Sequence, residues 1–171
     1  MAGEIPRVDP GAISDSAFKR ALFAFALTRA GTWYSSQLGA RVDPWLLRVS
    51  GGRVDHAFGQ IPIVLVSVRG ARSGVERTVP LLYFTDGDDV ILMASNYGGA
   101  RHPSWYHNLL AHPECELHLG PRGGSFLARE TDGAERDRLY ALAVDLYSGY
   151  AKYAQQTDGI RTIRVLRLTP R

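Results

Sequence analysis

From residue 61 to its end, the chain consists mainly of short segments rich in β-branched and aromatic residues, separated by tight turns. Ile63–Val68 is followed closely by Arg77–Phe84, and a turn at Asp86–Asp89 leads into Val90–Ser95. Strands joined by such short turns favour an antiparallel sheet, and a sheet with few crossover helices tends to close on itself. We therefore expect a mainly β fold with flanking helices, in which antiparallel strands form a barrel.

Three further strands and two helices complete the expected order of elements. The strands are predicted at Glu114–Leu119, Phe126–Arg129 and Ile160–Leu168. Pro103 is well placed as the first residue of a helix that covers Trp105–Ala111. A second helix starts near Ala134 and carries Leu139, Leu142, Ala143 and Leu146 on one face. Pro80 lacks a backbone donor, so the strand that contains it needs an edge or a bulge there.

The N-terminal third gives weaker signals. Ser14 or Asp15 can cap a helix that ends at Gly31. Its broad apolar face at Phe18–Leu27 either packs on the domain or lies on a membrane surface, and both interpretations remain open. A short hairpin or bulged edge is expected over residues 47–54. We divide the chain into an N-terminal helix with a connecting segment, residues 1–44, and a barrel domain, residues 45–171.

The termini predict where the protein is located. Met1–Pro10 lacks the basic start and apolar run of a signal peptide. The apolar run Ala21–Leu27 is seven residues long, whereas a helix that spans a bilayer needs about 20. We expect a cytoplasmic protein, and the N-terminal helix leaves open a peripheral location on the inner face of the plasma membrane.

Composition narrows the classes of partner. The 171 residues suit one domain, and the lone Cys115 excludes an internal disulfide. The net charge is only +3, but just two of the 20 basic residues are lysines, which leaves 18 arginines. Arginine binds phosphates and carboxylates bidentately, although a coding bias toward arginine would give the same count. Acidic residues are interspersed among the basic ones, so we expect no nucleic-acid partner.

Familiar catalytic devices are missing from the sequence. It contains no G-x-G-x-x-G, no P-loop and no G-x-S-x-G motif. Four of the five histidines follow one another at intervals of five or six residues, from His102 to His118, which does not suit chelation of one ion on a helix. We therefore expect no metal site, and Cys115 is interpreted as a buried, inert thiol.

Two glycine-containing loops and a helix start are the candidate binding elements. The segment Arg69–Arg77 joins two strands and carries three arginines, which with loop N–H groups can hold a phosphate or carboxylate. Ser95–Gly99 leads to the helix start at Pro103, where free N–H groups also attract anions. Tyr147, Tyr150 and Tyr153 recur every three residues; phenols in such a row can hydrogen-bond a substrate beside a pocket, although an aromatic row at helical spacing is more often packing.

These segments together resemble the deazaflavin-dependent nitroreductase family, whose members bind coenzyme F420 in a split β-barrel similar to the FMN-binding split barrels. The likeness runs from about Trp45 to Thr157 and is carried by four blocks in order. The blocks are Gly70–Gly74 with Arg77 and Pro80–Phe84, then Ala94–Gly99, then His102–Leu109 with His112-Pro113, and finally Tyr147–Tyr150 with Tyr153.

The resemblance implies roles for particular residues. The cofactor's phosphate and polyglutamate tail would be held by Ala71, Arg72, Ser73, Arg77, Thr78, Val79 and Pro80. The deazaflavin and its ribityl chain would be lined by Met93, Ala94, Ser95, Asn96, Ser104, Trp105, Tyr106, His107 and Asn108. Tyr147, Tyr150 and Tyr153 would face the substrate, with Tyr150 also against the cofactor. The chain departs from the family at Asn96, where a lysine is frequent, and at Ala71-Arg72, where more basic pairs occur.

The activity implied is transfer of a hydride from reduced F420 to a quinone or nitroaromatic acceptor. The cofactor carries the chemistry in such enzymes, so the absence of a catalytic triad is expected. Tyr150 is the candidate catalytic residue, because a phenol can stabilise the negative charge that grows on the acceptor. The alternatives are an FMN-binding split-barrel reductase and a non-catalytic deazaflavin carrier. A homodimer is also consistent with a split barrel.

Overall fold

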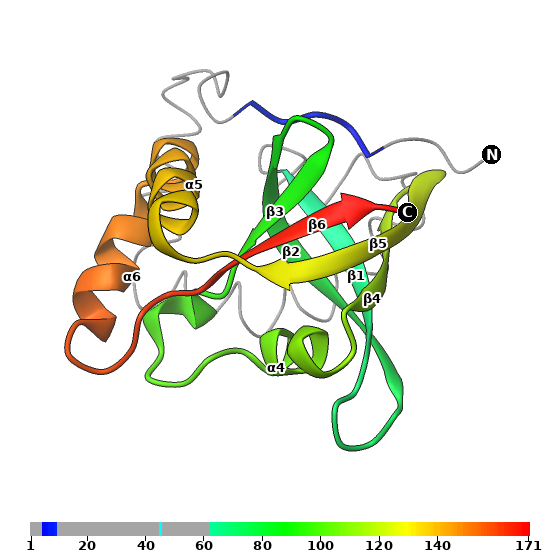
Figure 1. Cartoon of the computed structure of the whole chain (residues 1–171), viewed down its shortest axis with the longest axis horizontal. Coiled ribbons are helices and arrows are strands. Elements are labelled where there is room, and N and C mark those ends of the chain that lie inside the picture. The colour runs from blue at the N-terminus through cyan, green and yellow to red at the C-terminus, as the bar shows by residue number, and fades with distance from the viewer. Residues whose placement is uncertain (1–4, 10–44, 46–61) are drawn as a thin grey trace.

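A closed antiparallel barrel of six strands forms the centre of the computed structural model, which describes residues 5–9, 45 and 62–171 (Figure 1). The strands are β1 (Ile63–Arg69), β2 (Glu76–Asp86), β3 (Asp89–Met93), β4 (Glu114–Leu119), β5 (Arg122–Glu130) and β6 (Val165–Pro170). They follow one another around the barrel as β1-β2-β3-β6-β5-β4, and β4 pairs with β1 to close it. The predicted fold class is confirmed.

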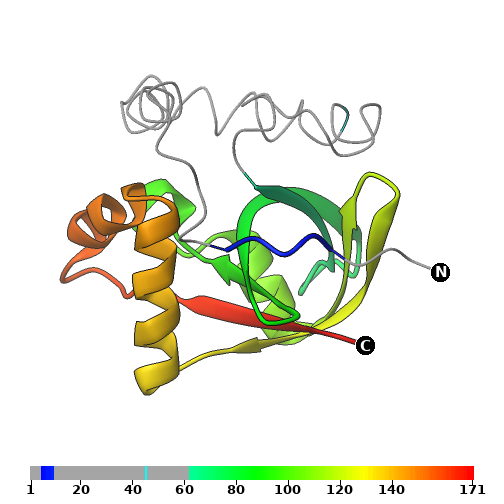
Figure 2. The same cartoon turned by 90° about the horizontal axis from the view of Figure 1, so that it is seen from above.

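The helices lie outside the barrel wall. They are the 3-10 turn η3 (Asn96–Gly98), α4 (Ser104–Ala111), α5 (Gly133–Leu146) and α6 (Gly149–Thr157). Helices α5 and α6 stand together at one side of the barrel, as both views show (Figures 1 and 2). Helix α4 packs Trp105, Tyr106 and Leu109 into the barrel core. Among the described residues, no helix is long and apolar enough to cross a membrane.

Two cores follow from the alternation of side chains along each strand. On β3, Val90 and Leu92 point into the barrel core, whereas Ile91 and Met93 join a second core against α5 and α6. On β6, Leu166 and Leu168 belong to the barrel core. A hydrophobic layer therefore covers both faces of this part of the sheet, and it fixes where α5 and α6 can lie.

The structure confirms most of the predicted elements and corrects several bounds. Pro80 is at an edge, because β2 pairs with β1 over Glu76–Leu82 and with β3 only over Tyr83–Asp86. Pro103 precedes α4 in an extended conformation (φ −66°, ψ 151°) rather than being its first helical residue. The final strand begins at Val165, later than expected. Helix α6 was not predicted, because its nine residues carry too few apolar positions to stand out from a loop.

A short N-terminal segment, residues 5–9, runs beside β2 at the end of the barrel away from α4 (Figure 1). Thr85 N donates to Val8 O at 3.0 Å, and Tyr83 Oη donates to Pro6 O at 3.2 Å. Ile5 is buried in the barrel core. The predicted N-terminal helix, the 47–54 hairpin and the boundary after residue 44 lie outside the described residues and stay predictions.

Candidate functional site

The loop between β1 and β2 is a tight turn attached to α4. Gly74 N donates to Gly70 O at 2.8 Å, and Gly70 N donates to Val75 O at 2.9 Å. Ala71 N donates to Asn108 Oδ1 at 2.9 Å, which joins the loop to the helix. The structure thus brings together two of the segments that the sequence analysis assigned to one site. Figure 1 shows this loop and α4 toward the same end of the barrel, with α6 at its side.

The arginines of this loop are available for an anion. Arg72 and Arg77 are exposed, and no carboxylate in the described part of the chain forms an ion pair with either. Behind them, Ser67 Oγ and Thr78 Oγ1 are hydrogen-bonded at 2.8 Å, which ties β1 to β2. This arrangement of exposed guanidinium groups on a fixed hairpin suits a phosphate or carboxylate tail.

A strained turn follows β3. Asn96 and Tyr97 both have positive φ, 47° and 53°. Non-glycine residues rarely adopt this left-handed conformation, and asparagine tolerates it better than most. Gly98 N donates to Ser95 O at 3.0 Å and Gly99 N donates to Asn96 O at 2.9 Å. Asn96 is therefore suited to this backbone, and its side-chain amide donates to Arg101 O at 2.9 Å.

Arg161 supports this turn from behind, and the sequence analysis did not identify it. Its Nε donates to Gly99 O at 2.9 Å, Nη1 to Ala94 O at 3.1 Å and Nη2 to Ser95 O at 2.7 Å. Nη1 also lies 3.3 Å from His102 Nδ1, just before α4. No sequence signal distinguished it, because it is one of many arginines and lies in a segment without a motif.

The three tyrosines form one buried cluster next to η3. The Tyr147 ring lies edge-to-face with those of Tyr150 and Tyr153, at centroid distances of 5.4 and 6.1 Å. Tyr147 Oη and Tyr153 Oη are 3.3 Å apart. Burial raises the pKa of all three phenols above the usual value, so each stays protonated at neutral pH. The three tyrosines are 4–8% exposed, as little as Trp105 and Tyr106, so contact with a substrate would require the cluster to open, and their roles stay predictions.

The other proposed cofactor residues differ in accessibility. Trp105 and Tyr106 are packed in the barrel core, where Tyr106 Oη donates to Glu130 Oε2 at 2.9 Å. Their rings therefore offer little open surface, and the roles expected of the α4 residues stay predictions. Met93 and Ala94 are buried as well, while Val79, Pro80 and Ser95 are half-buried.

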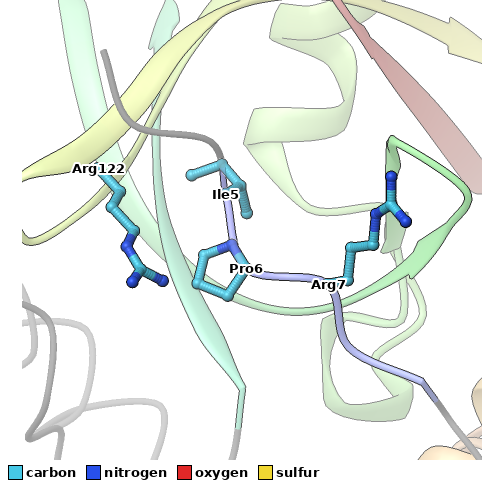
Figure 3. Close-up of a pocket in the computed structure, with 4 residues that line it drawn as sticks. All are labelled: Ile5, Pro6, Arg7 and Arg122. Carbon is cyan, nitrogen blue, oxygen red and sulfur yellow. The ribbon is translucent and has the colours of Figure 1, made fainter. Parts of the chain in front are cut away.

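Two pockets are lined by residues outside these loops, and the second reaches the turn after β3 through Arg161. One, of about 410 Å³, is lined by Ile5, Pro6, Arg7 and Arg122 beside the N-terminal segment (Figure 3). The other, of about 400 Å³, is lined by Arg136, Ala154 and the segment from Thr157 to Ile163, which includes Arg161. In the described residues, no cluster of three or more His, Cys, Asp or Glu side chains could hold a metal ion. Burial raises the pKa of the Cys115 thiol to about 12, which makes it a poor nucleophile.

Comparison with known proteins agrees with this geometry. A family model described as F420H(2)-dependent quinone reductase matches residues 39–168. An F420H(2)-dependent quinone reductase of Mycobacterium tuberculosis is 32% identical over 146 residues, 81% of this chain and 97% of the relative. A solved F420-H2 dependent reductase is 39% identical with a TM-score of 0.57, covering 63% of this chain and 93% of its own.

A second solved structure, described as a domain-swapped dimer, is 32% identical with a TM-score of 0.59 and covers 81% of this chain and 98% of its own. The family match spans both loops, α4 and the tyrosine cluster, so it includes every segment on which the sequence resemblance rested. The resemblance to F420-dependent reductases is confirmed. The chain belongs to the F420H(2)-dependent quinone reductase family.

Proposed function

We propose that the chain reduces quinones with the hydride of F420H2, which it binds between the 70–75 loop, the 93–99 turn and the start of α4. The single observation that carries this placement is the hydrogen bond from Ala71 N to Asn108 Oδ1, since it joins two of the three segments. Nitroaromatic compounds form a second acceptor class in this proposal, because a flat acceptor has the same shape requirement.

The tail of the cofactor is assigned to the β1–β2 hairpin. Arg72 and Arg77 are exposed and have no ion-pair partner among the described residues, and the loop N–H of Ser73 lies between them in the chain. Asn96 replaces the lysine frequent in relatives, and its amide is used within the turn. The charge that binds the tail therefore comes from the hairpin rather than from the turn.

The chain's own residues orient and solvate the reactants. When bound, reduced F420 supplies the hydride, and the protein supplies position and electrostatics. A quinone that accepts a hydride gains negative charge on an oxygen, which a neutral phenol can stabilise by donating a hydrogen bond. We assign this role to Tyr150, and substrate contacts to Tyr147 and Tyr153. The raised pKa of Tyr150 keeps its proton in place at neutral pH.

A fluorescence titration tests the proposal. The purified protein should change the fluorescence of F420 with saturation in the micromolar range, and F420H2 should be oxidised only when a quinone is added. Absence of any change at high micromolar F420 would overturn it. A protein that purifies yellow with bound FMN would support the alternative split-barrel reductase, and tight F420 binding without turnover on any acceptor would indicate a carrier.

Removing the Tyr150 hydroxyl should slow turnover and leave cofactor binding intact. We expect Tyr150→Phe to lower kcat roughly a hundredfold to a thousandfold, the effect of losing one hydrogen-bond donor to a developing oxyanion. Steady-state rates and the F420 titration measure the two quantities. The matched control is Tyr140→Phe, which also removes a phenol next to Tyr150, since Tyr140 Oη donates to Tyr150 O at 2.7 Å. Equal rates for wild type and Tyr150→Phe would make Tyr150 a packing residue only.

We further propose that two copies associate. Support comes from the 32% identical relative whose structure is described as a domain-swapped dimer. Sedimentation at micromolar protein concentration separates monomer from dimer.

The proposed peripheral contact with a membrane rests on the apolar sequence Phe18–Leu27 alone. Co-sedimentation with anionic vesicles, with and without residues 1–44, tests it.

A further inference from the structure

Arg161 joins three separate parts of the chain at one guanidinium group. It comes from the segment between α6 and β6, and it donates to the carbonyl oxygens of Ala94, Ser95 and Gly99 in the turn after β3. Its Nη1 also meets His102 Nδ1 in the residues just before α4. The same side chain thus contacts both the turn and the helix start that we propose as the two walls of the deazaflavin site.

The surroundings of Arg161 do not explain it as an ion pair. In the part of the chain that the structure describes, no carboxylate lies within ion-pair distance of it, and burial lowers its pKa. Burying a cation is unfavourable unless polar groups compensate for the lost water. Here the compensation is three backbone carbonyls and a neutral imidazole. Burial, together with the neighbouring Arg161 cation, lowers the pKa of His102, which favours the neutral ring, and in the tautomer with the proton on Nε2 its Nδ1 accepts from Arg161.

The turn that Arg161 contacts needs such support. Asn96 and Tyr97 are two successive residues in the left-handed region, at φ 47° and 53°. Residues in this conformation persist only when surrounding interactions hold them there. Helix α6 presses on the same turn, because a side chain at Gly98 would meet Gln156 Oε1 at 2.1 Å and Tyr153 Cδ1 at 3.1 Å. The turn is therefore held between α6 and Arg161.

We propose that Arg161 is a positioning residue for the cofactor: its guanidinium holds the strained 94–99 turn in the conformation that binds the deazaflavin. The inference deepens the proposed function and rests on it. The planar guanidinium of arginine donates to three carbonyl oxygens in different directions. The compact ammonium group of a lysine cannot reproduce this geometry. Arg161 acts through the backbone of the turn rather than by touching the reacting atoms.

Arg161→Ala should weaken F420 binding about tenfold, because affinity falls in proportion to the fraction of molecules whose turn is in the binding conformation. The KM for F420H2 should rise correspondingly, while kcat at saturating F420H2 changes less. Arg161→Lys should recover only part of the affinity. The matched control is Arg136→Ala, which removes another arginine from the same cavity but donates to Ile163 O instead of to the turn.

Added guanidinium ion should restore F420 affinity to Arg161→Ala. A variant that had only lost overall stability would not recover affinity in this way. The cavity of about 400 Å³ beside Arg161 gives a small cation access to the space left by the alanine. Guanidinium at millimolar concentration, far below the molar range that unfolds proteins, should restore F420 affinity to Arg161→Ala, and ammonium at the same concentration should not. Arg136→Ala and wild type should not respond to guanidinium.

A measurement without cofactor separates this inference from the proposed function. The amides of Gly98 and Gly99 donate within the turn, so their hydrogen exchange reports whether it is held. We expect exchange there to accelerate at least tenfold in Arg161→Ala and to slow again with guanidinium. Unchanged exchange together with unchanged F420 affinity would overturn the inference. Faster exchange in a protein whose wild type does not bind F420 would uphold the role of Arg161 in the turn and overturn the proposed function.

If Arg161→Ala fails to fold, Arg161→Lys carries the same test. The lysine variant keeps the charge and most of the side-chain volume, so it should fold while losing the fork geometry. Its turn amides should exchange faster than those of wild type, and its F420 affinity should lie between those of wild type and the tenfold reduction. A lysine variant equal to wild type in both measurements would contradict the proposal.

Discussion

Arg167→Met should lower the free energy of unfolding by about 3 kcal/mol, because it leaves three half-buried carboxylates without the guanidinium that they share. The Arg167 side chain is only 11% exposed although it lies on the outer face of β6. Its guanidinium contacts Asp86 Oδ2 at 2.5 Å, Asp89 Oδ2 at 2.6 Å and Glu135 Oε1 at 2.7 Å. It thereby ties the β2–β3 turn and α5 to β6. Urea denaturation at pH 7 measures the change.

The control removes an exposed arginine from the same network. Arg138 pairs with Asp86 at 2.6 Å, but its side chain is 53% exposed. Exposed pairs contribute about 0–1 kcal/mol, so Arg138→Met should cost no more than that. If the two variants lose equal stability, the burial of Arg167 is not what makes its ion pairs important. A loss of about 3 kcal/mol would be a large part of the roughly 5–15 kcal/mol that stabilises a folded domain.

Acid provides an independent check on this network. Hydrogen bonds from arginines hold the pKa of Asp86, first from Arg138, and that of Glu135, first from Arg129, at about 2. A carboxyl group whose pKa is lowered by folding stabilises the protein above its unfolded pKa, and this stabilisation is lost as the pH falls toward the folded value. The difference in stability between wild type and Arg167→Met should therefore narrow between pH 4.5 and pH 2. A difference that stays constant over this range would contradict the assignment.

The barrel could be predicted from the sequence because its signals are local. A few neighbouring residues are enough to identify the strand at Ile63–Val68 and the turn at Asp86–Asp89. The structure has a strand and a turn at these positions. The order β1-β2-β3-β6-β5-β4 depends on a pairing between β3 and β6 that are far apart in the sequence. No local pattern specifies that pairing, so closure of the sheet could be expected while its order could not.

The candidate site could be predicted only where residues form motifs. Ala71 and Asn108 were grouped by the family resemblance, and the structure joins them by a hydrogen bond. Arg161 and Arg167 were missed because an arginine with a structural task has the same sequence appearance as one on the surface. Their importance comes from burial and from partners such as Gly99 and Asp86, which are brought near only by the fold.

Gly149→Ala should destabilise the protein by about 2 kcal/mol or more and should lower turnover, although alanine is the better helix former. Gly149 begins α6, and its φ lies outside the left-handed region, so helix propensity alone would predict a gain of about 1 kcal/mol. However, an added Cβ would lie 2.3 Å from Tyr147 Cζ and 2.5 Å from Tyr147 Oη. Insertion of a methyl group into a packed core typically costs about 1–3 kcal/mol.

The clash should act through the tyrosine cluster. Moving the Tyr147 ring breaks its contact with Tyr153 Oη at 3.3 Å and its edge-to-face packing on Tyr150 at 5.4 Å. Thermal or urea unfolding and quinone reduction with F420H2 measure the two effects. The decisive control is the same substitution in a Tyr147→Ala background, where the ring is absent. There Gly149→Ala should become neutral or stabilising, and an unchanged cost would show that the Tyr147 ring is not what requires glycine at this position.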